Sequence, residues 1–422
     1  MADDKDSDSA KSKGADSCAE NGTWTSAPKP PSKLQPLDFA TIDPAENARV
    51  ATAGSMTFMM TGCSGDPDTP THTRAVAAAM VGAGGAAFFY HLGDVTYVPD
   101  KGSGGTDDER TLWNDQFYAA YTSFPKQIVS IAGNHDGKLS SHHKTSQLTN
   151  YMANFCADAS AWPHPWKHNS TDKRPAMIQP FVYWRFETPL AHFIGLYTNV
   201  VNGGMLDEPA PHADFRAGAQ YKWLVGELSA VKAANAQSTS KKAVLLALHY
   251  PPYSGAANFD VRGDQSKGPT PHAKHAPYLA VALQQAFAAA GQRPDVIFSA
   301  HAHLFQRLSY HYADGTVVPC LIVGCGGHSP LEDLSEPCAG GKGVQRPAPF
   351  PAVVPGTFAF PKGESAVVEY YEDGISGGMF GFLQVTIEAR TLSARFVDTS
   401  RTVRDGFVLD LDSHTYRATP VA

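Results

Sequence analysis

Four short segments of this chain carry side chains that commonly bind metal ions. In order, they are Gly93-Asp94, Gly133-Asn134-His135-Asp136, His249 and His301-Ala302-His303. Their donor atoms are carboxylate and amide oxygens and imidazole nitrogens, a set that suits iron, zinc or manganese. One carboxylate shared by two cations, with the other donors around it, would make most of a two-metal centre. The spacing therefore points to metal-assisted chemistry.

Each segment ends or follows an apolar run that predicts a β-strand. These runs cover residues 86–92, 127–132, 243–248 and 295–299. Because open α/β sheets bind ligands at the carboxyl ends of their strands, donors placed there can converge on one site. His301 and His303 are two residues apart, so on a regular strand both would face the same side.

Each candidate also has a simpler structural interpretation. Asp94 could cap a helix or a turn, Asn134 could form an Asx turn, and a single His249 after an apolar run is typical of a buried core histidine. Tyr97 is either a packed aromatic side chain or a phenolate ligand. The hypothesis of a metal site rests on the joint order of the donors at strand ends.

His135 and Asp136 are the candidate catalytic pair. Beside a metal ligand at Asn134, the His135 imidazole would lie near a substrate and could protonate a leaving oxygen. The Asp136 carboxylate could orient that ring and fix its tautomer.

Composition limits the class of protein. With 422 residues, 42% hydrophobic and 18% charged, the chain can form one large α/β domain or two smaller ones. A net charge of −7 without a basic tract excludes nucleic acid as an expected partner. No apolar run reaches about 18 residues, so no membrane span is expected. The six scattered cysteines predict free thiols in a reducing compartment.

The chain divides into a polar leader and one large domain. Residues 1–45 are rich in Ser, Asp, Lys and Pro, and predict a disordered or loosely packed segment. The absence of an apolar signal core there predicts a cytoplasmic protein, or an extracytoplasmic one if the sequence is a trimmed mature form. The domain is expected over 50–415, with a lid-like insertion at about 137–179. Its β-α-β start and alternating tail favour an α/β fold, in which helices flank two sheets packed face to face.

The ordered motifs resemble the calcineurin-like metallophosphoesterase superfamily, whose pattern includes Gly-Asp, Gly-Asn-His-Asp/Glu, a later His and Gly-His-x-His. Gly93-Asp94-Val-Thr-Tyr97 is similar to the purple acid phosphatase-like branch, in which this Tyr binds ferric iron. His301-Ala-His-Leu-Phe-Gln-Arg307 is similar to the His-x-His-x-Tyr-x-Arg run of that branch. Phe305 takes the Tyr position, and Ala300 replaces the Gly before the histidines. The resemblance covers about residues 55–411.

The resemblance implies an α/β/β/α fold and two metal ions, which could be Fe, Zn or Mn. Asp94 would bridge them, while His135 would contact the phosphoryl group and assist the leaving group. A metal-bound hydroxide would attack the phosphorus of a small phosphorylated substrate, with phosphomonoesters preferred to diesters. The remaining ligands would be Asn134, His249 and His301 at the second position, and His303 and Tyr97 at the first.

Cys63 departs from the family pattern, which places an aspartate ligand after the first strand. Three alternatives remain open: Cys63 binds the first metal as a thiolate, Asp66 or Asp68 replaces it, or the first position is weakened or empty. The last would favour a metal- or phosphate-binding pseudoenzyme over a phosphoesterase. The retained His135-Asp136 pair favours the enzyme, because a binding protein needs no leaving-group acid. The sequence gives no information on oligomeric state.

Overall fold

The computed structural model describes residues 30–67, 70–97, 109–137, 148–156, 177–198, 215–256, 276–332, 348–349, 360–372 and 379–419. In these residues the helices are α1 (Phe39–Ile42), α2 (Pro44–Ala53), α3 (Thr71–Ala83), α4 (Glu109–Trp113), the π-helix η1 (Asn114–Tyr118), α5 (Thr149–Phe155), the 3₁₀ helix η3 (Phe215–Ala217), α6 (Ala219–Gln237) and α7 (Ala276–Ala290). None of them has the length and apolar character needed to cross a membrane.

The described strands form two sheets. One has nine strands, in the order β1 (Leu37–Asp38), β5 (Trp184–Glu187), β6 (Ala191–Gly195), β7 (Ala243–Ala247), β8 (Val296–Ser299), β10 (Val317–Val323), β9 (Phe305–His311), β12 (Ser365–Glu372) and β11 (Ala348–Pro349). The other has seven, in the order β16 (Tyr416–Ala418), β15 (Val403–Asp410), β14 (Thr391–Asp398), β13 (Gly381–Glu388), β2 (Ser55–Thr61), β3 (Phe88–His91) and β4 (Gln127–Ser130).

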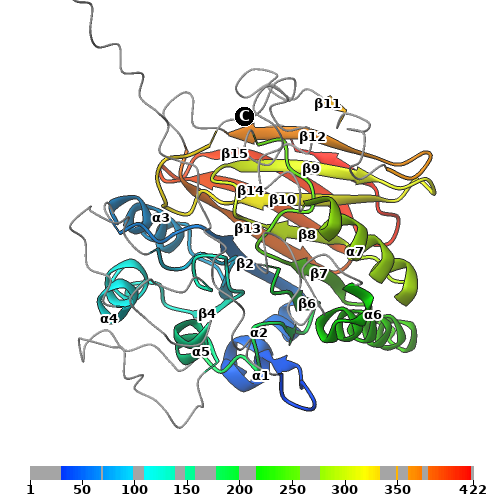
Figure 1. Ribbon diagram of the computed structural model, residues 1–422, viewed down its shortest axis with the longest axis horizontal. Coiled ribbons are helices and arrows are strands. Elements are labelled where there is room, and N and C mark those ends of the chain that lie inside the picture. The colour runs from blue at the N-terminus through cyan, green and yellow to red at the C-terminus, as the bar shows by residue number, and fades with distance from the viewer. Residues whose placement is uncertain are drawn as a thin grey trace, which may run out of the picture.

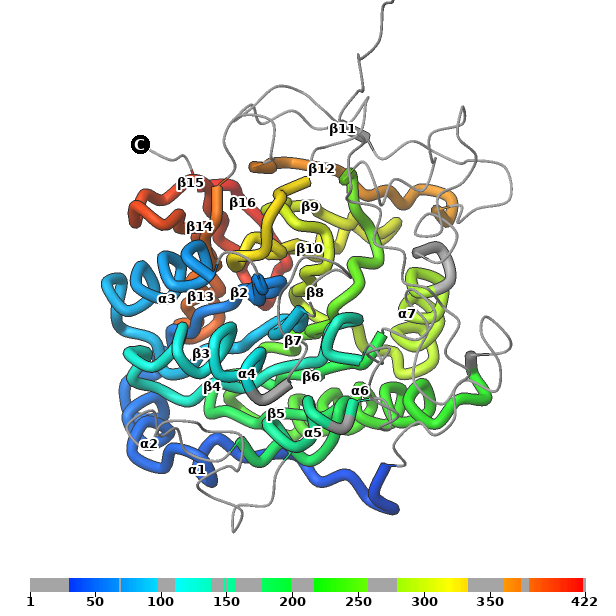
Figure 2. Tube along the Cα trace, turned by 60° about the vertical axis from the view of Figure 1, so that its left-hand side comes forward, coloured from blue at the N-terminus to red at the C-terminus, as the bar shows by residue number. Residues whose placement is uncertain are grey.

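Both sheets combine a parallel part with an antiparallel part. β2, β3 and β4 run parallel, as do β6, β7 and β8. The C-terminal strands β13, β14 and β15 pair antiparallel, as the alternating tail predicts. In both views β2 lies near β7 and β8 in the centre of the molecule (Figures 1 and 2), and Figure 2 shows β3 beside β2.

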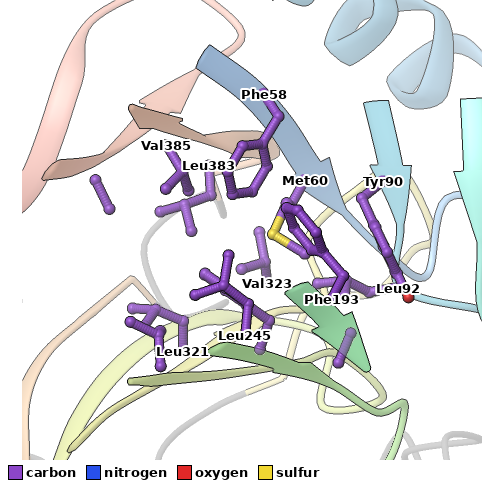
Figure 3. Packing of buried hydrophobic residues seen from close by; sticks show 14 of the residues in the cluster. Phe58, Met60, Tyr90, Leu92, Phe193, Leu245, Leu321, Val323, Leu383 and Val385 are labelled. Carbon is purple, nitrogen blue, oxygen red and sulfur yellow. The ribbon is translucent and has the colours of Figure 1, made fainter. Parts of the chain in front are cut away.

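The core lies between the two sheets. Phe58 and Met60 of β2 point towards Leu245 of β7 and Val323 of β10 (Figure 3). Neighbouring residues on the same strands, such as Met59, face the helices on the outer side. Because both faces of these strands are covered, they are nearly continuous in apolar residues.

Helices cover the outer faces. α6 and α7 pack on the nine-stranded sheet through Leu224, Leu228 and Phe287, while α3 and η1 pack on the seven-stranded sheet. Figure 1 shows the two groups of helices on opposite sides of the sheets. The predicted α/β fold, with two sheets packed face to face and helices outside, is confirmed.

Part of the expected leader at 1–45 is folded. Residues 1–29 of the expected leader lie outside the described residues, but β1 pairs with β5, and Phe39 is fully buried. Helix α2 has strong local signals: the Asp43 side chain accepts from the Glu46 N–H, Pro44 follows, and the helix ends at Gly54. The last third of the expected leader therefore belongs to the folded domain.

Most of the expected lid at 137–179 lies outside the described residues. Within it, α5 is described, and its Tyr151 and Phe155 are fully buried against the helices of the seven-stranded side. Elsewhere, α7, β9 and β12 have no counterpart among the sequence-based expectations. Buried polar residues such as Gln306 and Ser309 interrupt the apolar pattern of β9.

Arg307 joins the two sheets. It lies on β9 with no exposed surface, and its guanidinium donates to both carboxylate oxygens of Asp405 on β15, at 2.6 and 2.9 Å. It also donates to Glu369 and Tyr416. This paired charge fixes how one sheet lies on the other.

We expect Asp405→Asn to lower the free energy of unfolding by about 1.5–3 kcal/mol, because it removes the charged bidentate partner of Arg307 and leaves Glu369 as its paired carboxylate. Asp314→Asn is the matched control, since Asp314 pairs with Arg293 at 2.6 Å but is 55% exposed. That change should cost less than about 1 kcal/mol. Urea unfolding of both variants measures the difference, and equal losses would contradict the role of Arg307.

Candidate metal centre

The site forms where loops from both sheets meet. Cys63, Asp94 and Asn134 follow β2, β3 and β4 of the seven-stranded sheet, while His249 and His301 follow β7 and β8 of the other. Backbone hydrogen bonds connect these loops. The Cys63 N–H donates to the Gly93 carbonyl at 2.9 Å, and the Ala300 N–H donates to the His249 carbonyl at 3.0 Å. The site therefore lies at the joint carboxyl edge of two sheets.

Three of the candidate ligands have left-handed backbone conformations. The φ angles are 51° at Cys63, 54° at Asp94 and 65° at His301. Non-glycine residues rarely adopt such values, and where they do, the surrounding structure imposes them, commonly at functional sites.

His249 is aimed at two oxygen atoms. Its Nδ1–H donates to the Leu92 carbonyl at 2.8 Å, so in the neutral ring Nε2 carries the lone pair. Nε2 lies 3.1 Å from Asn134 Oδ1 and 3.2 Å from Asp94 Oδ2. The His301 ring is 5.1 Å from the His249 ring, centroid to centroid, and stacks on Tyr250 at 3.7 Å. These are the four donors expected for the second metal position.

Tyr97 is the centre of an adjoining group. Its hydroxyl donates to Asp94 Oδ2 at 2.9 Å and lies 3.2 Å from His303 Nε2. It also shares a hydrogen bond with Cys63. The residues expected at the first position are thus together, and Tyr97 is not merely a packed aromatic side chain.

Asp94 belongs to both groups. Its Oδ1 accepts from the His135 N–H at 2.8 Å, while Oδ2 faces Tyr97 and His249. Burial alone would raise the pKa of Asp94, but the nearby charges of His249 and His135 hold it well below its ordinary value. A buried, ionised carboxylate between two groups of donors suits the bridging role expected of it.

Glycine is required where the loops approach most closely. A Cβ atom at Gly133 would lie 2.0 Å from Asp94 Oδ1 and 2.3 Å from the Asp94 nitrogen. Gly93, with φ of 91°, lies between Gly133 and His249. Any side chain at Gly133 would push the Asp94 carboxylate out of place.

Asp136 braces the loops. The expected partner of its carboxylate was the His135 ring, but its described hydrogen bonds are to backbone N–H groups: Oδ1 accepts from Val95 and Thr96, and Oδ2 from Gly133. Burial and the Asp94 charge raise the pKa of Asp136 to about 7, against the lowering effect of the amides. We therefore assign Asp136 a positioning role rather than contact with substrate.

The expectation that His301 and His303 share one face of a strand is wrong. Both lie in the turn between β8 and β9, and His301 has φ of 65°. A left-handed residue breaks the two-residue alternation of an extended strand, so the turn, rather than strand geometry, brings both rings to the site.

Cys63 lies within the site. Its Sγ, a carboxylate oxygen of Asp94 and a nitrogen of His249 are mutually within 4.8 Å. Burial, followed by the Asp94 charge, raises the pKa of the Cys63 thiol well above its ordinary value. Asp66 is buried in the same loop, while Asp68 lies outside the described residues.

His328 is a site residue that the sequence analysis did not single out as functional. Its ring stacks on Tyr97 with centroids 3.6 Å apart and lies 4.8 Å from His303. Its Nδ1–H donates to the Gly65 carbonyl at 2.8 Å. The half-buried His135 ring also packs against Tyr97, with centroids 4.1 Å apart. In the sequence, the glycine-rich run Gly324-Cys-Gly-Gly-His328 is the signal that could have identified His328 as a site residue.

The donor set fits metal ions better than it fits a site without one. When the His249 ring is neutral, its Nε2 lone pair and the oxygens of Asp94 and Asn134 face one another, and all three are acceptors, whereas a protonated ring donates to Asp94. A cation among them would turn this unfavourable contact into coordination. Carboxylate, amide, imidazole, phenol and thiol groups together suit iron, zinc or manganese.

Comparisons with known proteins bear on the family and the fold. The calcineurin-like phosphoesterase family model matches residues 56–305. Among solved structures, PhoD superposes with a TM-score of 0.50 at 14% identity, covering 87% of this chain and 72% of its own. GAP50, the anchor in the inner membrane complex of Plasmodium, has a TM-score of 0.47 at 13% identity, covering 87% and 89%. No curated protein sequence matches the chain.

We expect Gly133→Ala to reduce bound metal severalfold, because the added methyl group displaces Asp94. The matched control is Gly226→Ala on α6, where a Cβ has no neighbour within 4 Å. Alanine there should stabilise the helix by about 0.5–1 kcal/mol and leave metal content unchanged. Elemental analysis and thermal melting measure both effects, and full metal content in Gly133→Ala would contradict the described loop packing.

Proposed function

The chain belongs to the calcineurin-like phosphoesterase family, and from this premise we propose that it is a metal-dependent hydrolase of phosphomonoesters. The proposal rests chiefly on one observation. His249 Nε2 faces Asp94 and Asn134 oxygens at 3.1–3.2 Å, while its Nδ1 is held by the Leu92 carbonyl. This arrangement supports the proposal, because the three side chains already face one another as metal ligands would.

In this proposal Asp94 bridges two metal positions. Asn134, His249 and His301 complete the second position, and Tyr97 and His303 serve the first. Bound cations would lower the pKa of a water molecule and neutralise charge on the phosphoryl oxygens. The identity of the two ions, among Fe, Zn and Mn, depends on this donor set and on supply.

His135 is the proposed acid for the leaving group. Its backbone N–H is held by Asp94 Oδ1 at 2.8 Å, and its ring packs on Tyr97. The side chain is half-buried, unlike the fully buried Asp94, so a substrate can reach it. Asp136 supports it indirectly, because its carboxylate hydrogen-bonds to the backbone of Gly133 and of residues 95–96 and so holds the two loops together.

The proposed substrate is a small phosphorylated molecule. A preference for monoesters over diesters rests on the Gly93-Asp94-Val-Thr-Tyr97 run, which resembles the purple acid phosphatase-like branch. The Tyr97 hydroxyl, directed at Asp94 and His303, agrees with a ligand role in that branch.

We expect Asn134→Ala and His249→Ala to lower the rate of hydrolysis of an aryl phosphate by more than about a hundredfold. Mutation of residues that only hydrogen-bond to a metal ligand already lowers metal affinity or activity about ten- to a hundredfold, and loss of a ligand itself should cost more. The control is Asn235→Ala on α6, whose amide bonds only with the Lys242 backbone among described residues. Activity and metal content of the purified chain are measured together. If both ligand variants keep parental activity, the ligand assignment fails. A parent that binds metal without hydrolysis would be a pseudoenzyme.

We expect His135→Ala to impair alkyl phosphate hydrolysis about 10²- to 10⁴-fold, the usual range for acid catalysis. An aryl phosphate should lose much less, because its leaving group needs little protonation. Metal content should stay at the parental level. Steady-state kcat/KM values for both substrates give the comparison, and equal losses would show that His135 acts on binding rather than on the leaving group.

A further inference from the structure

The backbone of Cys63 is held from both sides. Its N–H donates to the Gly93 carbonyl, and its own carbonyl accepts from the His328 N–H, both at 2.9 Å. The side chain is fully buried, and φ is 51°. The loop of Gly93 carries Asp94, and the loop of His328 carries the His328 ring. Because both loops belong to the site, these hydrogen bonds fix the position of the Cys63 sulfur within it.

The sulfur of Cys63 behaves as an acceptor. The His301 N–H donates to Sγ at 3.2 Å. By contrast, the sulfurs of the buried Cys320 and Cys325 donate to backbone carbonyls, at 3.7 Å to Val318 and 4.0 Å to Gly381. The N–H···S hydrogen bond from His301 lowers the pKa of the Cys63 thiol, against burial and the Asp94 charge, which raise it.

The other donors around Cys63 are those of a metal ligand set. Sγ lies within 4.8 Å of an Asp94 oxygen and a His249 nitrogen, and Tyr97 hydrogen-bonds with Cys63. Among the described residues, Cys63 is the member of this group of donors that comes from the loop after β2, and Asp66 of the same loop is not part of the group. The Gly65 carbonyl, beside Asp66, is already engaged by His328 Nδ1.

From these contacts we propose that Cys63 is a thiolate ligand of the first metal position, which therefore takes a thiophilic ion such as Zn²⁺. This inference rests on the proposed function, because it assigns a ligand within the same centre. On binding, the thiol loses its proton to solvent and a sulfur–metal bond forms, without change of oxidation state. A thiolate selects zinc over manganese more strongly than the carboxylate expected from the family pattern.

X-ray absorption of the zinc-loaded full chain tests the ligand directly. We expect one sulfur neighbour at about 2.3 Å in the parent. It should be absent in Cys63→Ser and Cys63→Asp and retained in Cys325→Ser, which removes an equally buried sulfur. In competition with Mn²⁺, Cys63→Asp should lower the preference for zinc by at least about tenfold.

The outcomes separate the two proposals. Zinc bound through oxygen and nitrogen alone, with aryl phosphate hydrolysis intact, would overturn the ligand role of Cys63 and leave the function standing. A sulfur ligand without hydrolysis would support Cys63 and overturn the function. A parent that binds no zinc would overturn the ligand role of Cys63, and a parent that binds none of iron, zinc and manganese would overturn both. The parent spectrum decides the question even if a Cys63 variant fails to fold.

Discussion

The buried carboxylate of Asp94 is the constraint on which the centre depends. Its two oxygens meet the Tyr97 hydroxyl from the same loop and groups from two other loops, the His135 N–H and the His249 ring. Burying a charge is unfavourable unless it is paired and hydrogen-bonded, so these partners must be in place together. The left-handed turn at Asp94 and the missing side chain at Gly133 provide the necessary space.

The sheet packing sets the distances between those loops. Asp94 belongs to one sheet and His249 to the other, so any slip between the sheets would pull the donors apart. Phe58 and Met60 fill the interior against Leu245 and Val323. Apolar contacts alone allow some sliding, whereas the buried Arg307–Asp405 pair has one geometry. Core packing thus provides stability, and the ion pair supports register.

Within this frame the two proposed metal positions differ in their donors. The second has oxygen and imidazole donors, and the geometry of His249 is preset by the Leu92 carbonyl. The first is lined by a phenol, an imidazole and the Cys63 thiol. His328 stacks on Tyr97 and the His135 ring packs against it, and these contacts restrict the orientation of the phenol. Stacking is therefore part of how the site positions its donors.

The sequence alone was enough to predict the layered fold and the membership of Asp94, Asn134, His249, His301, His303 and Tyr97 in one site. Apolar runs and glycine-flanked polar motifs are local patterns, so they can be recognised in the sequence without knowledge of the fold. The roles of Asp136 and His328, the turn at His301 and the Arg307–Asp405 pair were decided only by tertiary structure. Each depends on backbone or side-chain partners far away in the sequence. Such contacts exist only once both sheets have packed, so no local pattern records them.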